Sequence, residues 1–140
     1  MNMSMAVNLS DIIEAIESAD DSSEYYLDRV TGEVVWISQI AMSRAEQEEA
    51  FDVLDEHGFY RLPEQRDIND YRIMEEFIAS LPSGEAQEGL SRAIDGQGAF
   101  RRFKDTVKWL GIENDWYEWK ESSYRRLAIK WCEENELDYE

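Results

Sequence analysis

Residues 24–37 read EYYLDRVTGEVVWI, and this stretch decides between an all-helical chain and a mixed one. Two segments rich in aromatic and β-branched residues flank Thr31-Gly32, which is the pattern of a β-hairpin. Gly32 supplies the positive φ that such a turn or its adjoining bulge requires. Because an isolated two-stranded hairpin is marginally stable at best, it must pack on helices or recruit a third strand, for which residues 59–62 are the candidate.

Helical patterns lie on both sides of this hairpin. Ser10 predicts the N-cap of a helix that ends near residue 19. Ser43 and Glu46 match a capping box, and the helix that they begin is expected to close at His57-Gly58.

Four further helices are expected downstream. Hydrophobic spacing predicts two of them over residues 67–80 and 85–94, followed by a break at residues 96–98. The next helix places on its apolar side Phe100, Phe103, Val107 and Leu110. The last helix has an apolar seam made of Trp116, Trp119 or Lys120, Ser123, Tyr124, Leu127, Ala128 and Trp131. The expected fold is α+β and mostly helical, with an N-terminal helix, a β-hairpin with a candidate third short strand, and a bundle of four to five helices, all in a single domain over residues 1–140.

Length and composition favour a folded protein in a reducing compartment. The 140 residues are 43% hydrophobic and include five tryptophans, so disorder is not expected despite a net charge of -18. Cys132 is the single cysteine, which excludes an intramolecular disulfide and fits a cytoplasmic location. The first residues lack the pattern of a secretory signal, and no apolar run approaches the ~18 residues of a membrane span.

The charge is distributed unevenly along the chain. Residues 1–91 hold 21 acidic and 5 basic side chains, whereas residues 92–140 hold 11 acidic and 9 basic ones. An acidic surface repels duplex nucleic acid and anionic membranes and attracts basic partners, so a basic protein is the expected partner. The alternative interpretation is that the carboxylates only keep exposed helix faces soluble.

The basic and aromatic residues of the C-terminal third form the candidate binding set. Its members are Arg101, Arg102, Lys104, Arg125, Arg126, Lys130, Trp116 and Trp119. Paired arginines suit phosphate recognition, so this set predicts, as an alternative function, binding of an anion, a nucleotide or a single-stranded nucleic acid, with phosphate chemistry included. The simpler interpretation is that the arginines form helix ion pairs, such as Glu121 with Arg125, and that the tryptophans are core residues.

No complete catalytic or metal-binding set can be assembled. The Gly96-Gln97-Gly98 turn has Arg101 where a dinucleotide fingerprint needs its third glycine, so it is expected to join two helices. His57 is the only histidine, and its place at a helix end suits the helix dipole better than metal ligation. Cys132 lacks a histidine partner and fits a small buried residue. We therefore expect no metal and no cofactor, and a non-enzymatic protein is favoured.

Four segments resemble one known family. They are DRVTGEVVWI (28–37), GQGAFRRFKDTV (96–107), WYEW (116–119) and YRRLAIKWCEENEL (124–137), and they are similar to the uncharacterised bacterial protein family UPF0158. The resemblance implies a small bacterial protein that is usually cytoplasmic. It brings no functional residues, because the family has no established activity.

The leading hypothesis is a small acidic interaction or regulatory module that binds a basic protein partner. A related possibility is that the acidic half mimics DNA and occupies a nucleic-acid-binding protein. The oligomeric state is left open, with a dimer through the hairpin edge among the alternatives.

Overall fold

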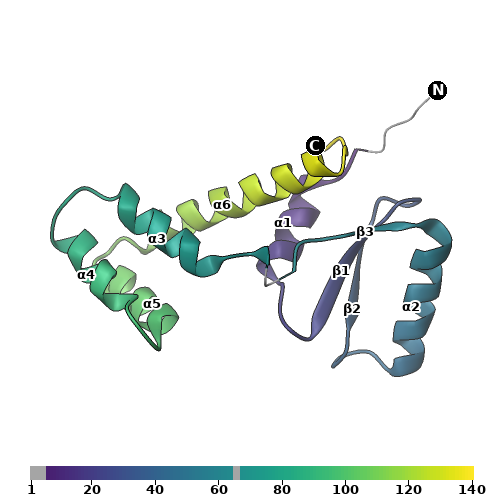
Figure 1. Cartoon of the computed structure of the whole chain (residues 1–140), viewed down its shortest axis with the longest axis horizontal. Helices are drawn as coiled ribbons and strands as arrows, with labels where there is room; N and C mark the ends of the chain where they lie inside the picture. The colour runs from purple at the N-terminus through teal and green to yellow at the C-terminus, as the bar shows by residue number, and fades with distance from the viewer. Residues whose placement is uncertain (1–5, 65–66) are drawn as a thin grey trace. The chain divides into compact units, whose positions relative to one another are not determined.

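The computed structural model describes residues 6–64 and 67–140. Its elements follow in the order α1 (Leu9–Glu17), β1 (Ser23–Asp28), β2 (Val34–Ser38), α2 (Arg44–His57), β3 (Phe59–Arg61), α3 (Asp70–Ser80), α4 (Glu85–Ala93), α5 (Ala99–Trp109) and α6 (Glu113–Glu134) (Figure 1). The chain is α+β and mostly helical, as the sequence predicts.

Two compact units can be distinguished. The sheet unit comprises the described part of Met1–Ile68 with Tyr124–Glu140, and the helical unit comprises Asn69–Ser123, so α6 contributes to both. The expectation of one domain stays a prediction.

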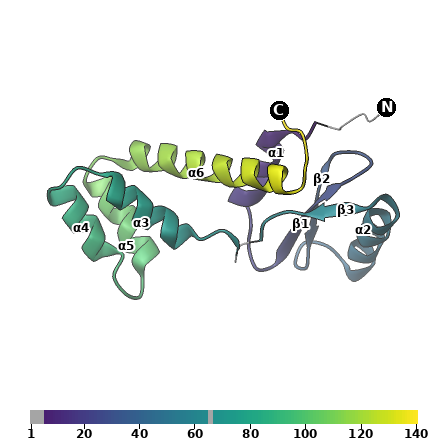
Figure 2. The same cartoon turned by 45° about the horizontal axis from the view of Figure 1, so that its top comes forward.

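The sheet of the sheet unit has the strand order β2-β1-β3, and both pairings are antiparallel (Figure 2). Strands β1 and β2 form the predicted hairpin, in which Tyr25 is opposite Trp36 and Gly32 has a φ of 74°. Strand β3 pairs with β1, so the prediction of a third strand near residues 59–62 is also confirmed.

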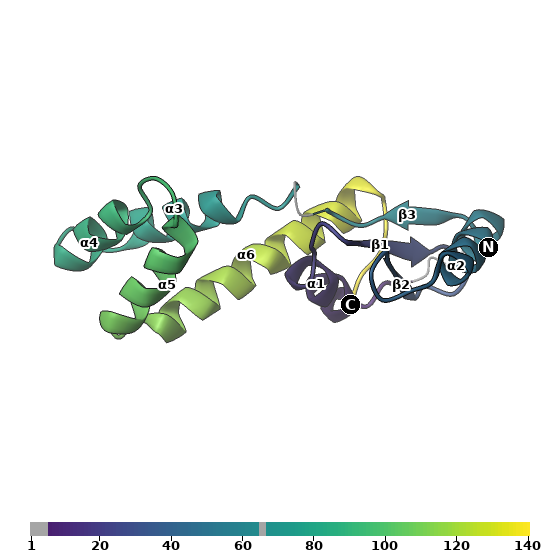
Figure 3. The ribbon, with the colours of Figure 1, turned by 90° about the horizontal axis from the view of Figure 1, so that it is seen from below.

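Helices α1 and α2 lie on either side of this sheet (Figure 1), and Figure 3 shows β1 between β3 and β2. On one face, Tyr26 and Ile37 form a core cluster with Leu54 of α2. Helix α2 begins with the predicted capping box, since Ser43 Oγ accepts from Glu46 N and Glu46 Oε1 accepts from Ser43 N, each at 3.1 Å. On the other face lies α1, whose side chains line a groove with Tyr25 of β1 and Trp36 of β2.

The start of α1 differs from the prediction. The N-cap is Asn8 rather than Ser10, and its side chain accepts from the N–H of Asp11. The earlier start brings Leu9, Ile12 and Ile16 onto one face, and all three are buried. Asn8 and Ser10 are both good N-cap residues, and burial of this apolar face therefore decides which of them begins the helix.

The chain termini of the sheet unit are held together by backbone hydrogen bonds. Val7 N donates to the carbonyl of Asp138 at 2.8 Å, and Glu140 N donates to the carbonyl of Val7 at 3.0 Å. Within the same unit, the indole N–H of Trp131 on α6 donates to the carbonyl of Arg61 on β3 at 2.9 Å. Cys132, next to it, is fully buried, as predicted.

The helical unit is built around aromatic rings. The ring of Phe103 lies 4.6 Å from that of Trp116 and 6.2 Å from that of Phe77, measured between centroids, and all three residues are buried. The prediction that Phe100 is also a core residue is wrong, because it is 53% exposed. The buried stripe of α5 passes through Ala99, Phe103 and Val107 at four-residue intervals, and this leaves Phe100 at its edge.

Candidate functional site

Negative charge is concentrated in one of the two units. The sequence of the sheet unit holds 21 acidic and 7 basic residues, whereas that of the helical unit holds 11 acidic and 7 basic ones. The formal charges are therefore -14 and -4, which add to the -18 of the whole chain. A site for a basic partner is accordingly expected on the sheet unit.

A groove of about 510 Å³ runs between α1 and the β1–β2 hairpin of this unit. Helix α1 lines it with Asp11 and Glu14, which share one helix face because they are three residues apart, and the C-cap residue Ser18 follows four residues after Glu14. The hairpin contributes Glu33 at its turn and the cross-strand pair Tyr25 and Trp36. We call this set of residues the acidic groove.

The acidic groove combines two features that recognise cations. Its three carboxylates, those of Asp11, Glu14 and Glu33, are on exposed residues, and Trp36 is 45% exposed beside them. Carboxylates form charge-assisted hydrogen bonds with guanidinium and ammonium groups, and tryptophan provides the best ring face for a cation–π contact. The sequence analysis predicts an acidic module with a basic protein partner but names none of these residues as a binding site. The spacing of Asp11, Glu14 and Ser18 in the sequence could have indicated that these three polar side chains share one side of the first helix.

A second polar cluster in the sheet unit joins the hairpin turn to the end of α2. His57 Nδ1 lies 2.7 Å from Oδ2 of Asp28, whose side chain is only 4% exposed, whereas that of His57 is 29% exposed. The other oxygen of Asp28 accepts from the N–H groups of Val30 and Thr31, at 2.8 and 3.0 Å. Sequence reasoning placed His57 correctly at a helix end but missed this partner, which is 29 residues away in the chain.

The carboxyl group of Asp28 is kept ionised by these contacts. Burial alone would raise its pKa, but the hydrogen bonds from Thr31, His57 and Val30, together with the charge of His57, hold the pKa below its ordinary value. Nearby, a Cβ added to Gly58, which has a φ of +80°, would lie 3.1 Å from Arg29 Cδ, and the Arg29 guanidinium lies 4.9 Å from the centroid of the Tyr60 ring. This cluster fastens the hairpin turn to the junction between α2 and β3.

The predicted basic set is divided between the two units. Arg101, Arg102 and Lys104 lie on α5 of the helical unit, and Trp116 and Trp119 lie in the part of α6 that belongs to the same unit. Arg125, Arg126 and Lys130 lie in the part of α6 that belongs to the sheet unit. Trp116 is buried and Trp119 is half-buried, with its ring 6.0 Å from that of Phe77. Lys130 Nζ is 3.9 Å from Oε1 of Glu134, four residues further along α6, which is a helix ion pair of the kind that the simpler interpretation expects.

Arg102 is engaged in holding the turn between α4 and α5. Its guanidinium donates to the carbonyls of Ala93 at 2.8 Å and Asp95 at 2.7 Å, and to the carbonyl of Gln97. These carbonyls lie at or just after the end of α4, where backbone acceptors lack partners within the helix. We therefore leave Arg102 out of any anion site, while its neighbour Arg101 is exposed on α5.

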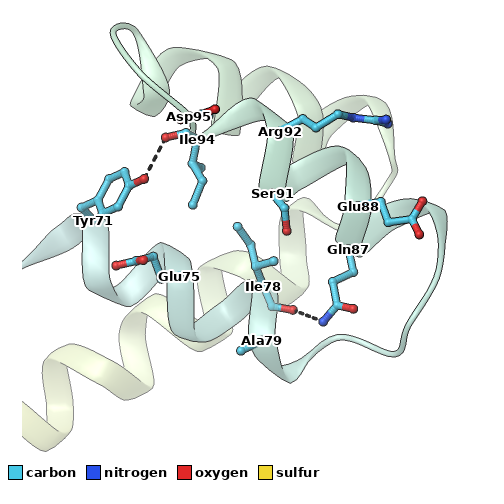
Figure 4. Close-up of a pocket in the computed structure, with 10 residues that line it drawn as sticks. All are labelled: Tyr71, Glu75, Ile78, Ala79, Gln87, Glu88, Ser91, Arg92, Ile94 and Asp95. Atoms are coloured by element: carbon cyan, nitrogen blue, oxygen red, sulfur yellow. Dashed lines mark hydrogen bonds between the residues drawn. The ribbon is translucent and has the colours of Figure 1, made fainter.

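An open cleft of about 750 Å³ lies between helices α3 and α4 of the helical unit (Figure 4). Its polar groups serve the fold, because the Tyr71 hydroxyl donates to the Ile94 carbonyl and Gln87 Nε2 donates to the Ile78 carbonyl, both at 2.9 Å. In Figure 4 the side chains of Glu88 and Arg92 extend away from Tyr71. The groups drawn do not converge on one point, so we assign no chemistry to this cleft.

The fold and the groove together define a small acidic α+β protein with a surface groove lined by carboxylates and two aromatic rings. The chain belongs to the uncharacterised protein family UPF0158, whose model matches residues 2–140. It is 23% identical over 137 residues to a UPF0158 protein of Pseudomonas aeruginosa, and the match covers 95% of this chain and 85% of that relative. The family resemblance seen in the sequence is thus confirmed. No solved structure matches the chain, and within its described part we find no helix long and apolar enough to span a membrane.

Proposed function

We propose that this protein is a non-enzymatic interaction module that binds a basic segment of a protein partner in the acidic groove. The observation that carries the proposal is the combination of Asp11, Glu14 and Glu33 with the exposed ring of Trp36 in one groove. In this mode an arginine or lysine of the partner stacks on Trp36 while the carboxylates accept its N–H groups. The setting proposed for this binding is the cytoplasm, where the lone cysteine stays reduced.

The magnitudes require a partner with several basic residues. One exposed ion pair contributes only ~0.2–1 kcal/mol, and one exposed cation–π contact contributes ~0.5–1 kcal/mol. Several such contacts must act together to reach micromolar affinity, which corresponds to about -8 kcal/mol. The charge of -14 on the sheet unit adds long-range attraction, which raises the association rate and weakens as salt is added.

A short arginine-rich peptide with a fluorescent label tests the proposal by fluorescence anisotropy against the full-length protein. The test variant is Glu14→Lys with Glu33→Lys, which reverses two charges in the groove. The matched control is Asp52→Lys with Glu56→Lys, which reverses two exposed charges on α2, across the sheet from α1. The two proteins have the same net charge, so a site in the groove requires the groove variant to lose at least about tenfold more affinity than the control.

The contribution of the aromatic ring is tested separately. Trp36→Thr keeps a residue that suits a strand, and Trp109→Gln removes an equally large but more exposed ring from the helical unit. We expect Trp36→Thr to weaken binding by about three- to tenfold and Trp109→Gln to leave it unchanged, as the energy of one cation–π contact implies. No peptide binding at low salt, or equal losses in the groove and α2 variants, would refute the proposal. Displacement of a captured partner by duplex DNA would show that the partner is a nucleic-acid-binding protein.

A further inference from the structure

The helical unit contains a small, partly open pocket that the proposed function does not use. Its volume is about 220 Å³, and three helices line it with Asp70 and Met74 of α3, Phe100, Phe103 and Lys104 of α5, and Trp116 and Lys120 of α6. All of these residues belong to Asn69–Ser123. We call this space the aromatic pocket.

The inner part of the aromatic pocket is apolar. Met74, Phe103 and Trp116 are buried residues, and the rings of Phe103 and Trp116 meet edge to face with an interplanar angle of 75°. Phe100 is different, because it lines the same pocket and yet is 53% exposed. An exposed phenylalanine beside a buried aromatic pair offers a further ring surface to a bound molecule. Phe100, which the sequence predicted to be a core residue, is thus an exposed residue of the pocket lining.

The charged groups of the pocket have a positive balance. Lys104 lies four residues after Phe100 on α5, and Lys120 lies four residues after Trp116 on α6, so each lysine is next to an aromatic residue on its helix face. Asp70 is the one carboxylate in the lining. Two ammonium groups against one carboxylate leave a local charge of +1 in a chain whose net charge is -18. The pocket is therefore a locally cationic site on an acidic protein.

We propose that the aromatic pocket binds a small aromatic carboxylate, with its single ring against Phe100, Phe103 and Trp116 and its carboxylate beside Lys104. The rings favour a planar aromatic body through edge-to-face and offset contacts, and the positive balance selects an anionic group. The volume sets the size, because pockets for drug-sized ligands span roughly 300–1,000 Å³ and this one is smaller. The site lies in a different unit from the acidic groove, so it does not depend on the function proposed above.

Benzoate is the probe, and its binding to the full-length protein is measured by isothermal titration calorimetry. Benzyl alcohol, which has the ring without the charge, and adenosine monophosphate, which is larger and carries phosphate, are titrated in parallel. The test variant is Lys104→Glu, and the control is Lys108→Glu, which makes the same change four residues further along α5 and outside the pocket lining. Both lysines are on exposed residues, and glutamate and lysine have similar helix propensities, so both variants are expected to fold.

The expected result is saturable binding of benzoate that weakens at least about tenfold in Lys104→Glu and stays within about twofold in Lys108→Glu, as the loss of one charge-assisted contact implies. Phe100→Ala is expected to weaken benzoate binding and to lower the melting temperature much less than Phe103→Ala does, since the Phe100 ring is half exposed. Absence of saturable benzoate binding, equal losses in both lysine variants, or equal affinity for benzyl alcohol would each overturn the proposal. Tighter binding of adenosine monophosphate with the same dependence on Lys104 would overturn the carboxylate assignment in favour of a phosphate site.

Discussion

The neighbouring arginines of α5 offer the sharpest test of which basic residues belong to the scaffold. Arg101 and Arg102 follow each other on one helix and are both classed as exposed, yet only the Arg102 guanidinium has hydrogen bonds in the structure to the three carbonyls of Ala93, Asp95 and Gln97. A hydrogen bond from a charged donor contributes ~1.5–3 kcal/mol when it is buried, and far less where solvent competes. Since the Ala93 bond is part-buried and the other two are exposed, we expect Arg102→Ala to lower the free energy of unfolding by about 1–2 kcal/mol.

The same substitution at Arg101 is the matched control. Arg101→Ala removes an exposed side chain and replaces it with the best helix former, so the free energy of unfolding is expected to change by less than ~0.5 kcal/mol. Arg102→Lys is expected to recover little stability, because a lysine ammonium cannot spread its donors over three separated carbonyls as a guanidinium does. Urea unfolding followed by circular dichroism measures all three values, and the slope with denaturant should stay constant if the native fold is kept. A loss in Arg102→Ala as small as that in Arg101→Ala, below ~0.5 kcal/mol, would refute the capping role and would return Arg102 to the candidate anion site.

Three further substitutions test the aromatic core of the helical unit and the hydrogen bonds of Asp28. Phe103→Ala should lower the free energy of unfolding by ~3–5 kcal/mol because it empties the space between Phe77 and Trp116. Phe100→Ala should lower it by less than ~1.5 kcal/mol, because Phe100 lies at the edge of the buried stripe. Thermal melts in which the two variants coincide would contradict this assignment. The lowered pKa of Asp28 means that its stabilising contribution is present above the unfolded-state value of ~3.9 and is lost as the pH falls through the folded-state value. The stability difference between the wild type and Asp28→Asn should therefore shrink as the pH falls below about 4, and a difference that grows on acidification would show that the charge of Asp28 is not what stabilises the turn.

The elements predicted from the sequence are those governed by short-range rules. The turn at Gly32 fixes the hairpin, and Ser43 with Glu46 fixes the start of α2, because in each case the residues that interact are within a few positions of one another. The short third strand was also predicted, since a hairpin needs further hydrogen-bonding partners for its edge. Helix positions followed from apolar spacing, although the choice of Asn8 over Ser10 as the cap of α1 depended on tertiary burial of Leu9.

The features that were missed depend on contacts between distant parts of the sequence. His57 contacts Asp28 across 29 positions, and no local pattern pairs a histidine at the end of one helix with an aspartate before a turn. The engagement of Arg102 requires the course of the α4–α5 turn, which composition does not specify. Phe100 fits the apolar spacing of α5 as well as Phe103 does, and only the neighbouring helices decide which ring is covered. Sequence periodicity identifies a helix face to within about one residue, and the packing selects among its members.

The distribution of carboxylates in the sheet unit bears on whether its charge has a binding role or only a solvating one. Helix α2 carries six acidic residues, Glu46, Glu48, Glu49, Asp52, Asp55 and Glu56, and all are exposed. Helix α2 therefore carries more carboxylates than α1. Of the two helices, however, only α1 contributes carboxylates to the acidic groove, where they lie beside Tyr25 and Trp36. Water-exposed carboxylates that serve solubility have no need of an exposed tryptophan, whose ring adds apolar surface to the protein and favours association. The coexistence of both kinds of surface on opposite faces of one sheet supports the proposal that the charge of α2 maintains solubility and long-range attraction, while a cation of the partner binds in the acidic groove beside its aromatic pair.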